Sequence, residues 1–281
     1  MDYLLLRNGN QIPCVGFGTW QITDRERMSE LFSKAYDEGY RLIDTAAAYS
    51  NEIALAKAIA AKGINRNELF LSDKVWNTCR GYDLVQEACR KSLKKMKTDY
   101  FDLYLIHWPA SMKLYSDWEE INAETWRGME RLYKDGLVKN IGVCNFKVHH
   151  LEKLKRSADI MPFINQIEVH PGLNQREIVD YCKRENIMIE ASSPLGNGQI
   201  LQNSVLKSIA EAKQVTVAQI CLRWNLQNGI AVIPKTSNID RLHTNIDVFN
   251  FKLSEEEMDQ INRIPYCGGI GIDSDEVIEF G

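Results

Sequence analysis

Short apolar runs of strand length alternate with longer segments of helical period along almost the whole chain. Two of the intervening segments, after Gly81 and after Asn122, place apolar side chains at near-helical spacing, which predicts amphipathic helices. This alternation is typical of repeated βα units that build a parallel sheet. The eight strand-like runs are GFGTW, RLIDTA, LFLSDKVW, YFDLYLIHW, VKNIGVCNF, FINQIEVH, IMIEASSPL and AVIPKTS.

Eight parallel strands with intervening helices predict an α/β fold, a (β/α)8 TIM barrel that occupies residues 1–281 as a single domain. The alternative is an open doubly wound sheet. It is disfavoured because Gly16 and Gly18 lack the third glycine and the following helix of a dinucleotide-binding fingerprint. Ahead of these runs, apolar segments flank Asn8 and Gly9, a pair that tolerates a tight turn and predicts an N-terminal β-hairpin.

Charge and hydropathy exclude two classes of partner. The formal net charge is −4 and no long basic tract occurs, so a nucleic-acid partner is not expected. No apolar stretch approaches the roughly 18 uninterrupted residues that a membrane-spanning helix needs. We therefore expect a soluble, cytoplasmic protein with no membrane partner.

Cysteine and histidine patterns predict reduced thiols and no metal site. The seven cysteines are scattered without a C-x-x-C pair, which is typical of free cytosolic thiols. His149 and His150 are adjacent, so they are not expected to share a helix face as the two histidines of an H-E-x-x-H motif do.

Four polar residues lie at or just beyond the ends of three successive strand-like runs: Asp44, Tyr49, Lys74 and His107. Residues at the carboxyl ends of barrel strands converge on one mouth. A phenol has a pKa near 10, so it gains as a proton donor from a neighbouring ammonium, and a carboxylate can keep that buried ammonium charged. Strand alternation turns Asp73 outward if Lys74 points into the barrel. The four side chains could thus polarise and protonate a carbonyl group.

Each of these residues also has an ordinary structural interpretation. Asp44 and Lys74 could form a buried ion pair without catalytic use, His107 could be a hydrogen-bonded core histidine, and Tyr49 could pack by its ring. The catalytic hypothesis rests on the four occurring together.

Eight ordered segments, covering nearly the whole chain, resemble those of the aldo-keto reductase family. The resemblance implies a (β/α)8 barrel whose N-terminal hairpin closes the bottom, and NADPH-dependent reduction of aldehydes and ketones. It implies that Tyr49 is the general acid, that Lys74 and Asp44 lower its pKa, and that His107 orients the substrate. The segments are GFGTW, DTAAAYSNE, LSDKVW, LIHWP, IGVCNF, NQIEVHP, SSPLG and IPKTSNIDRLHTN.

Candidate cofactor residues lie on the later runs. Asn145 and Gln166 carry amides that could bind a carboxamide, or could merely cap loops. The resemblance assigns both to the nicotinamide. It also places Thr19, Asp44 and the segment Ser192, Ser193, Pro194 and Leu195 at the cofactor.

The segment IPKTSNIDRLHTN combines two cations with hydroxyl groups, which suits a phosphate at a helix start. A solvated basic helix start is the alternative. Asn245 is expected at the start of a helix. The resemblance assigns the following residues to the 2′-phosphate of NADPH: Lys235, Thr236, Ser237, Arg241 and Asn245.

Three residues depart from the pattern of the family. Thr244 replaces an acidic residue that contacts adenine, and Ser192 replaces an aromatic residue that stacks on the nicotinamide. Cys144 replaces a serine at the carboxamide, where a thiol is a weaker hydrogen-bonding partner than a hydroxyl. These changes predict weaker cofactor contacts, or a substitute aromatic side chain from elsewhere.

Three tryptophans next to the predicted catalytic residues, Trp20, Trp76 and Trp108, could form an apolar wall for the substrate together with His107, or could cap the barrel core. The short glycine-rich tail resembles those of prokaryotic, diketogluconate reductase-like members, and we expect it to leave the pocket open. The expected protein is a monomeric reductase of a small carbonyl compound. A non-catalytic NADPH-binding regulatory or structural protein on the same fold is the alternative. A short-chain dehydrogenase is disfavoured because no Tyr-x-x-x-Lys pair occurs.

Overall fold

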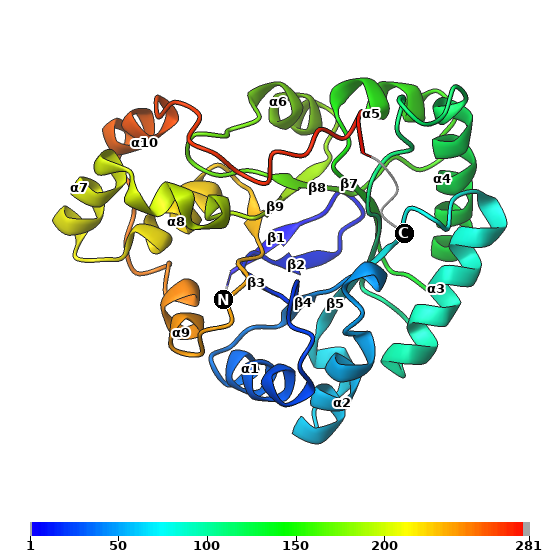
Figure 1. The fold of residues 1–281 in the computed structure, drawn as a ribbon, viewed down its shortest axis with the longest axis horizontal. Coiled ribbons are helices and arrows are strands. Elements are labelled where there is room, and N and C mark those ends of the chain that lie inside the picture. Colours follow the sequence, from blue (N-terminus) through cyan, green and yellow to red (C-terminus); the bar gives the residue numbers. More distant parts are fainter. Residues whose placement is uncertain (1, 278–281) are drawn as a thin grey trace.

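A computed structural model describes residues 2–277, and the eight predicted strands form one parallel sheet in it. The sheet order is β10-β9-β8-β7-β6-β5-β4-β3, so neighbours in the sheet are neighbours in sequence. Parallel bridges join Val15 to Val232 and Gly18 to Lys235, which brings the first and last strands together as a barrel (Figure 1). The strands are β3 (Gly16–Gly18), β4 (Leu42–Asp44), β5 (Phe70–Val75), β6 (Leu103–Ile106), β7 (Ile141–Cys144), β8 (Ile164–Glu168), β9 (Met188–Ser192) and β10 (Ala231–Val232).

The glycine pair of β3 makes this closure possible. A Cβ at Gly16 would lie 2.6 Å from Cγ of Leu42, and one at Gly18 would lie 3.1 Å from the carbonyl oxygen of Ile233. The two glycines therefore serve strand packing at the barrel seam, which agrees with the absence of a dinucleotide fingerprint around them.

Helices ring the barrel and cover the outer face of the sheet (Figure 1). The helix predicted after Gly81 is α3, whereas α4 begins at Trp118, before the predicted start at Asn122. The helices are α1 (Arg25–Asp37), α2 (Glu52–Lys62), α3 (Tyr82–Met96), α4 (Trp118–Lys134), α5 (Val148–Lys155), α6 (Arg176–Arg184), α7 (Ser204–Lys213), α8 (Val217–Gln227), α9 (Asp240–Ile246) and α10 (Glu255–Asn262), with 3-10 turns η1 (Ala47–Tyr49), η2 (Arg66–Glu68) and η3 (Gly196–Gln202).

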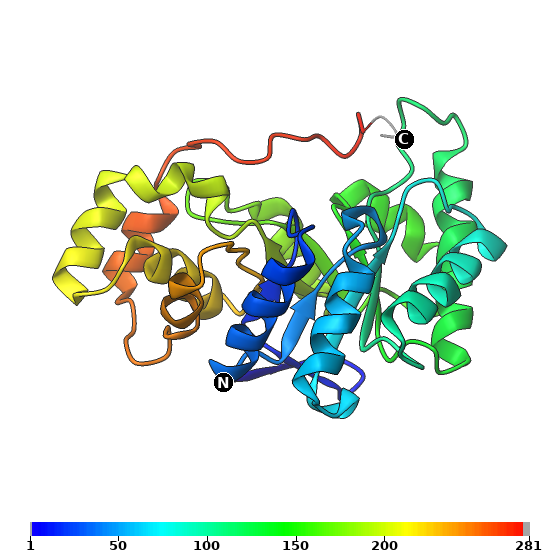
Figure 2. The same cartoon turned by 60° about the horizontal axis from the view of Figure 1, so that its bottom comes forward.

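The N-terminal hairpin is present and lies at the end of the barrel opposite the C-terminal tail (Figure 2). Strands β1 (Tyr3–Leu5) and β2 (Gln11–Pro13) pair antiparallel, and Gly9 in the turn has φ of 86°. Ile12 is fully buried beneath the sheet, and Nδ2 of Asn8 donates to Oδ1 of Asn140 at 2.8 Å. No helix within residues 2–277 is both long and apolar enough to cross a membrane.

Candidate active site

A buried ion pair joins the ends of β4 and β5. Nζ of Lys74 lies 2.6 Å from Oδ2 and 2.7 Å from Oδ1 of Asp44, and it donates a third hydrogen bond of 2.9 Å to the carbonyl oxygen of Thr45. Burial alone would lower the pKa of Lys74, but the Asp44 carboxylate outweighs it, and the pKa is raised above its usual value. The ammonium is therefore charged at every working pH.

Tyr49 follows β4 in the turn η1 and stands against this pair. The ammonium of Lys74 lies 5.2 Å from the centroid of the Tyr49 ring. Burial raises the pKa of the phenol, Lys74 opposes that effect, and the carboxylate of Asp44 adds to it, so the pKa of Tyr49 lies above its ordinary value. Lys74 lowers the pKa of Tyr49 as expected, whereas Asp44 raises it by a smaller amount, and burial outweighs the effect of the ammonium because loss of hydration penalises the phenolate. Tyr49 therefore keeps its proton, and Lys74 reduces the cost of giving it up.

His107 follows β6 and faces the same point. Its ring centroid lies 5.8 Å from that of Tyr49 and 5.2 Å from that of Trp76. Burial, and secondarily the charge of Lys74, hold the pKa of His107 well below its usual range. A neutral imidazole carries one N–H donor, which is what a substrate oxygen beside the phenol would require.

These groups open into one large pocket of about 1190 Å³ at the mouth of the barrel. Trp20, Trp76 and Trp108 all line this pocket and give it an aromatic wall. Lys74 lies beneath the floor and is fully buried. The remaining predicted residues that line the pocket are Asp44, Tyr49, His107, Cys144, Asn145, Gln166, Ser192, Ser193, Pro194, Leu195, Lys235, Thr236, Ser237 and Arg241.

Amide groups line the middle of this pocket. Nδ2 of Asn145 donates to the carbonyl oxygen of His107 at 3.0 Å, which ties the end of β7 to the end of β6. The side-chain oxygen of Gln166 lies 3.6 Å from Sγ of Cys144. The aromatic side chains of the pocket all come from residues before Asn145, so Ser192 has no substitute stacking partner among the lining residues of β7 to β10.

The distal end of the pocket is basic. Lys235 and Arg241 line it, and neither forms an ion pair with another residue of the described chain. Oγ1 of Thr236 donates to the carbonyl oxygen of Asn238 at 3.1 Å and accepts from its N–H, which shapes the turn ahead of α9. Two unneutralised cations beside a turn suit a phosphate group.

Two predicted cofactor residues do not reach the pocket. Asn245 was expected at a helix start, but α9 begins at Asp240, and Asn245 lies buried in its last turn. Thr19 is fully buried and donates from Oγ1 to the carbonyl oxygen of Asp44 at 2.9 Å, so it supports the strand end.

The tail closes over the pocket, contrary to the expectation of an open one. Ile270 and Ile272 line the pocket, and the N–H of Ile270 donates to Oε1 of Glu168 at 2.9 Å. Figures 1 and 2 show the tail running across the mouth of the barrel. This course was not predictable, because the contacts that hold the glycine-rich tail come from residues far away in the sequence.

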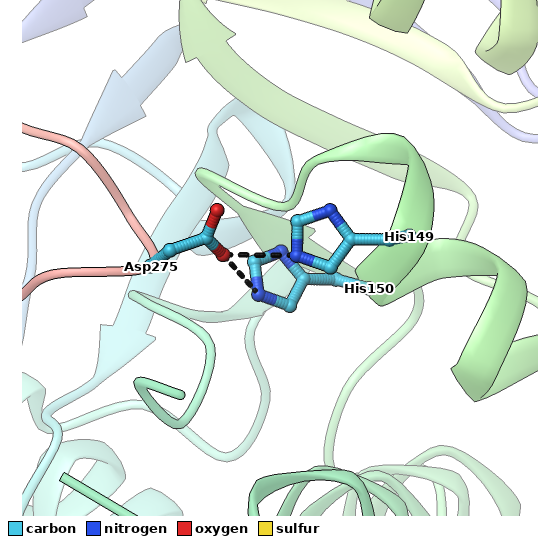
Figure 3. A group of neighbouring side chains, drawn as sticks. All are labelled: His149, His150 and Asp275. Carbon is cyan, nitrogen blue, oxygen red and sulfur yellow. Dashed lines mark hydrogen bonds and ion pairs between the residues drawn. The ribbon is translucent and has the colours of Figure 1, made fainter. Parts of the chain in front are cut away.

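A second contact holds the tail at Asp275, where two imidazoles converge (Figure 3). Oδ1 of Asp275 lies 2.9 Å from Nε2 of His149 and 3.1 Å from Nε2 of His150, and Nζ of Lys147 lies 2.7 Å from Oδ2. The adjacent histidines therefore do point to one place, against the expectation from their spacing. The backbone N–H of Lys147 donates to Nδ1 of His150 at 3.1 Å, so a neutral His150 carries its proton on Nε2, the nitrogen that lies nearest to Asp275. Ligand atoms of His149, His150 and Asp275 lie within 4.8 Å of one another, and the contacts with Asp275 join the tail to α5.

One further acidic residue, Glu190 on β9, went unnoticed in the sequence. It is fully buried inside the barrel and accepts a hydrogen bond of 2.6 Å from Nε2 of Gln166. Glu190 lies two residues before Ser192 on the same strand, and alternate residues of a strand face the same side. This spacing could have indicated that Glu190 points into the barrel.

Comparisons with known proteins agree with this geometry. Residues 14–265 match the model of the aldo/keto reductase family. The chain is 45% identical to glyoxal reductase of Bacillus subtilis over 99% of this chain and 98% of that protein. It is 40% identical to the methylglyoxal reductase DkgA of Escherichia coli over 96% of each chain.

Solved structures give the same result. The aldo/keto reductase from Brucella melitensis superposes with a TM-score of 0.88 at 42% identity, covering 94% of this chain and 99% of that one. A mutant of Gox0644 crystallised in complex with NADPH superposes with a TM-score of 0.91 at 36% identity, covering 99% and 98%. With its barrel, its buried ion pair and these relatives, the chain belongs to the aldo/keto reductase family.

Proposed function

We propose that the chain reduces small aldehydes and α-dicarbonyl compounds to alcohols with NADPH, and that Tyr49 gives the proton. The observation that carries this proposal is the meeting of Tyr49, His107 and the Lys74–Asp44 pair beneath an aromatic wall. The names of the glyoxal and methylglyoxal reductases support this substrate class. NADPH-dependent carbonyl reduction is the activity that the family assignment carries to this chain.

The described residues fit the cofactor. At about 1190 Å³, the pocket exceeds the roughly 300–1,000 Å³ common for small-ligand sites, which leaves room for an extended dinucleotide and a substrate. Asn145 and Gln166 offer amides to a carboxamide. Lys235 and Arg241 offer charge to a phosphate, and when bound, NADPH supplies the hydride.

The chain's own groups supply the proton and the orientation. The neutral His107 ring and the Tyr49 hydroxyl hold the carbonyl oxygen, which polarises the carbonyl group. As negative charge develops on that oxygen, the Tyr49 O–H bond breaks and its proton passes to the oxygen, so that carbonyl, hydride and proton give the alcohol. The Lys74 ammonium stabilises the resulting phenolate, and Asp44 keeps Lys74 in place.

Loss of NADPH absorbance in the presence of glyoxal, methylglyoxal and 4-nitrobenzaldehyde tests the proposal. We expect turnover with each compound, and little with NADH. NADPH binding without any turnover across a wider panel of aldehydes, ketones and keto-sugars would instead favour the non-catalytic alternative.

We further propose that the enzyme is a single-domain, cytoplasmic monomer. All the proposed catalytic side chains come from one barrel, and the seven cysteines are free, as in a reducing compartment. Sedimentation analysis would contradict the monomer if it showed a stable dimer at assay concentrations.

Replacing Arg241 by glutamine is expected to weaken NADPH binding about tenfold or more, since hydrogen bonds to charged groups contribute about 1.5–3 kcal/mol. NADH binding should be unchanged, because NADH lacks the 2′-phosphate. Titration calorimetry with both cofactors measures the difference. Arg263→Gln, an exposed arginine beyond α10, is the matched control. Equal losses of affinity for NADPH and NADH would mean that Arg241 does not bind the 2′-phosphate.

Replacing Ser192 by tyrosine is expected to tighten NADPH binding by about 2- to 12-fold, because a ring at this wall of the pocket could stack on the nicotinamide, and aromatic pairs contribute about 0.5–1.5 kcal/mol. Fluorescence titration gives the dissociation constant. Ser192→Leu adds bulk without a π face and serves as the control. The same gain in both variants, or none in either, would argue against a missing stack.

A further inference from the structure

We propose that Glu190 is a positioning residue of the active site, which acts with Asp44 to fix the side-chain amide of Gln166 so that its oxygen faces the nicotinamide carboxamide. This inference rests on the proposed function, since it needs NADPH to bind beside Gln166. Neither the family match nor the relatives' names assign a role to Glu190.

Three neighbouring strands bring the relevant side chains to one level of the barrel. Gln166 on β8 is in register with Cys144 on β7 and with Glu190 on β9. Asp44 reaches Gln166 from the other side of the barrel interior, through Oδ1 at 3.1 Å from Nε2. The amide of Gln166 therefore lies between two carboxylates, one from each side.

These contacts determine which way the amide points. The side-chain nitrogen of Gln166 has two hydrogens, and they meet Asp44 Oδ1 at 3.1 Å and Glu190 Oε2 at 2.6 Å. Ionised carboxylates only accept hydrogen bonds, so the reversed amide would set its oxygen against the oxygen of Asp44 and, whenever Glu190 is ionised, against a second negative oxygen. Oε1 of Gln166 is thus held beside Cys144 at the pocket wall, where it can accept from the NH₂ of a carboxamide.

The placement of Glu190 is costly for the fold. Its side chain is fully buried, and Oε1 has no hydrogen-bonding partner among residues 2–277. Burial, and secondarily Asp44, raise the pKa of Glu190 to about 7. A leucine would fill the same space without a charge to desolvate, so stability does not explain the carboxylate.

A double-mutant cycle between Glu190 and Gln166 tests the proposal. Dissociation constants for NADPH are measured by quenching of tryptophan fluorescence in the wild type, Glu190→Leu, Gln166→Ala and the double variant. Glu190→Leu should weaken binding about tenfold in the wild-type background and less than about twofold when Gln166 is absent, since Glu190 acts through that side chain. Glu190→Gln keeps an acceptor oxygen and should stay within about threefold of the wild type.

Stability separates positioning from a structural role. Because the raised pKa of Glu190 means that its ionised form destabilises the folded state at higher pH, Glu190→Leu should melt at or above the wild-type temperature at pH 8. Glu52→Leu is the control, since Glu52 is an equally buried carboxylate that pairs with Lys95 at 2.6 Å, outside the pocket, and its loss should leave NADPH binding unchanged.

The outcomes are distinguishable. Additive losses in the double variant, or unchanged binding by Glu190→Leu, would overturn the positioning role while leaving the reductase assignment intact. A wild-type protein that does not bind NADPH would overturn both. A folded Glu190→Leu protein with a lower melting temperature and unaltered binding would assign Glu190 to the fold alone.

Discussion

Replacing Tyr49 by phenylalanine is expected to lower kcat by about 10²- to 10⁴-fold, the usual contribution of a general acid. Phenylalanine keeps the ring that packs against Lys74 and His107 but has no hydroxyl to donate. NADPH affinity should stay within about twofold of the wild type, because the amide and cationic contacts lie elsewhere in the pocket. Single-turnover kinetics together with fluorescence titration separate the two quantities.

Tyr266→Phe provides a matched control for this variant, since Tyr266 is 63% exposed near the start of the tail and does not line the pocket. It should keep full turnover. If Tyr49→Phe retained more than about a tenth of wild-type kcat, another group would have to be the proton donor.

Replacing Lys74 by methionine is expected to cost about 3–5 kcal/mol in the free energy of unfolding, because it leaves the carboxylate of Asp44 buried without its cation. Turnover should also fall steeply, since no ammonium remains to stabilise the Tyr49 phenolate. Urea denaturation measures the first effect, and steady-state assays below the unfolding temperature measure the second.

The double variant Asp44→Asn with Lys74→Met separates structure from chemistry. Replacing both members of a buried pair is often nearly neutral for stability, so the double variant should recover most of the lost stability. It should not recover turnover. Recovery of both would mean that the pair serves the fold only, and recovery of neither would mean that the hydrogen bonds from Ser72 and Gln166 to Asp44 matter more than the charge balance.

The barrel was predictable because eight short, mainly apolar runs alternate with segments of helical period. The four catalytic candidates were predictable because the strand ends of one barrel meet at one mouth. Asp44, Lys74 and His107 close three successive strands, so their convergence follows from topology alone. The seam at Gly16 and Gly18 was not predictable, since only the contacts with Leu42 and Ile233 show what the glycines serve.

Properties that depend on packing could not be predicted from the sequence. The raised pKa of Tyr49 reflects how much water the surrounding walls exclude, which no motif records. Asn245 was misplaced because α9 begins at Asp240, five residues before the position expected for the helix start. Glu190 was missed because a single acidic residue in an apolar run does not indicate which side chain it will contact. Gln166 becomes its neighbour only through the register of β8 and β9.

The tail contacts the barrel rim at Glu168, at the Lys147–His149–His150 group and at Ser111, whose hydroxyl donates to the carbonyl oxygen of Asp275. Any movement of the tail away from the pocket therefore has to break at least one of these contacts. The side chain of Asp275 is 26% exposed, whereas that of Glu168 is 12% exposed. Dissolved ions screen the ion pairs of an exposed carboxylate more strongly than those of a buried one. We therefore expect added salt to loosen the tail first at Asp275, at the rim and away from the reacting carbonyl.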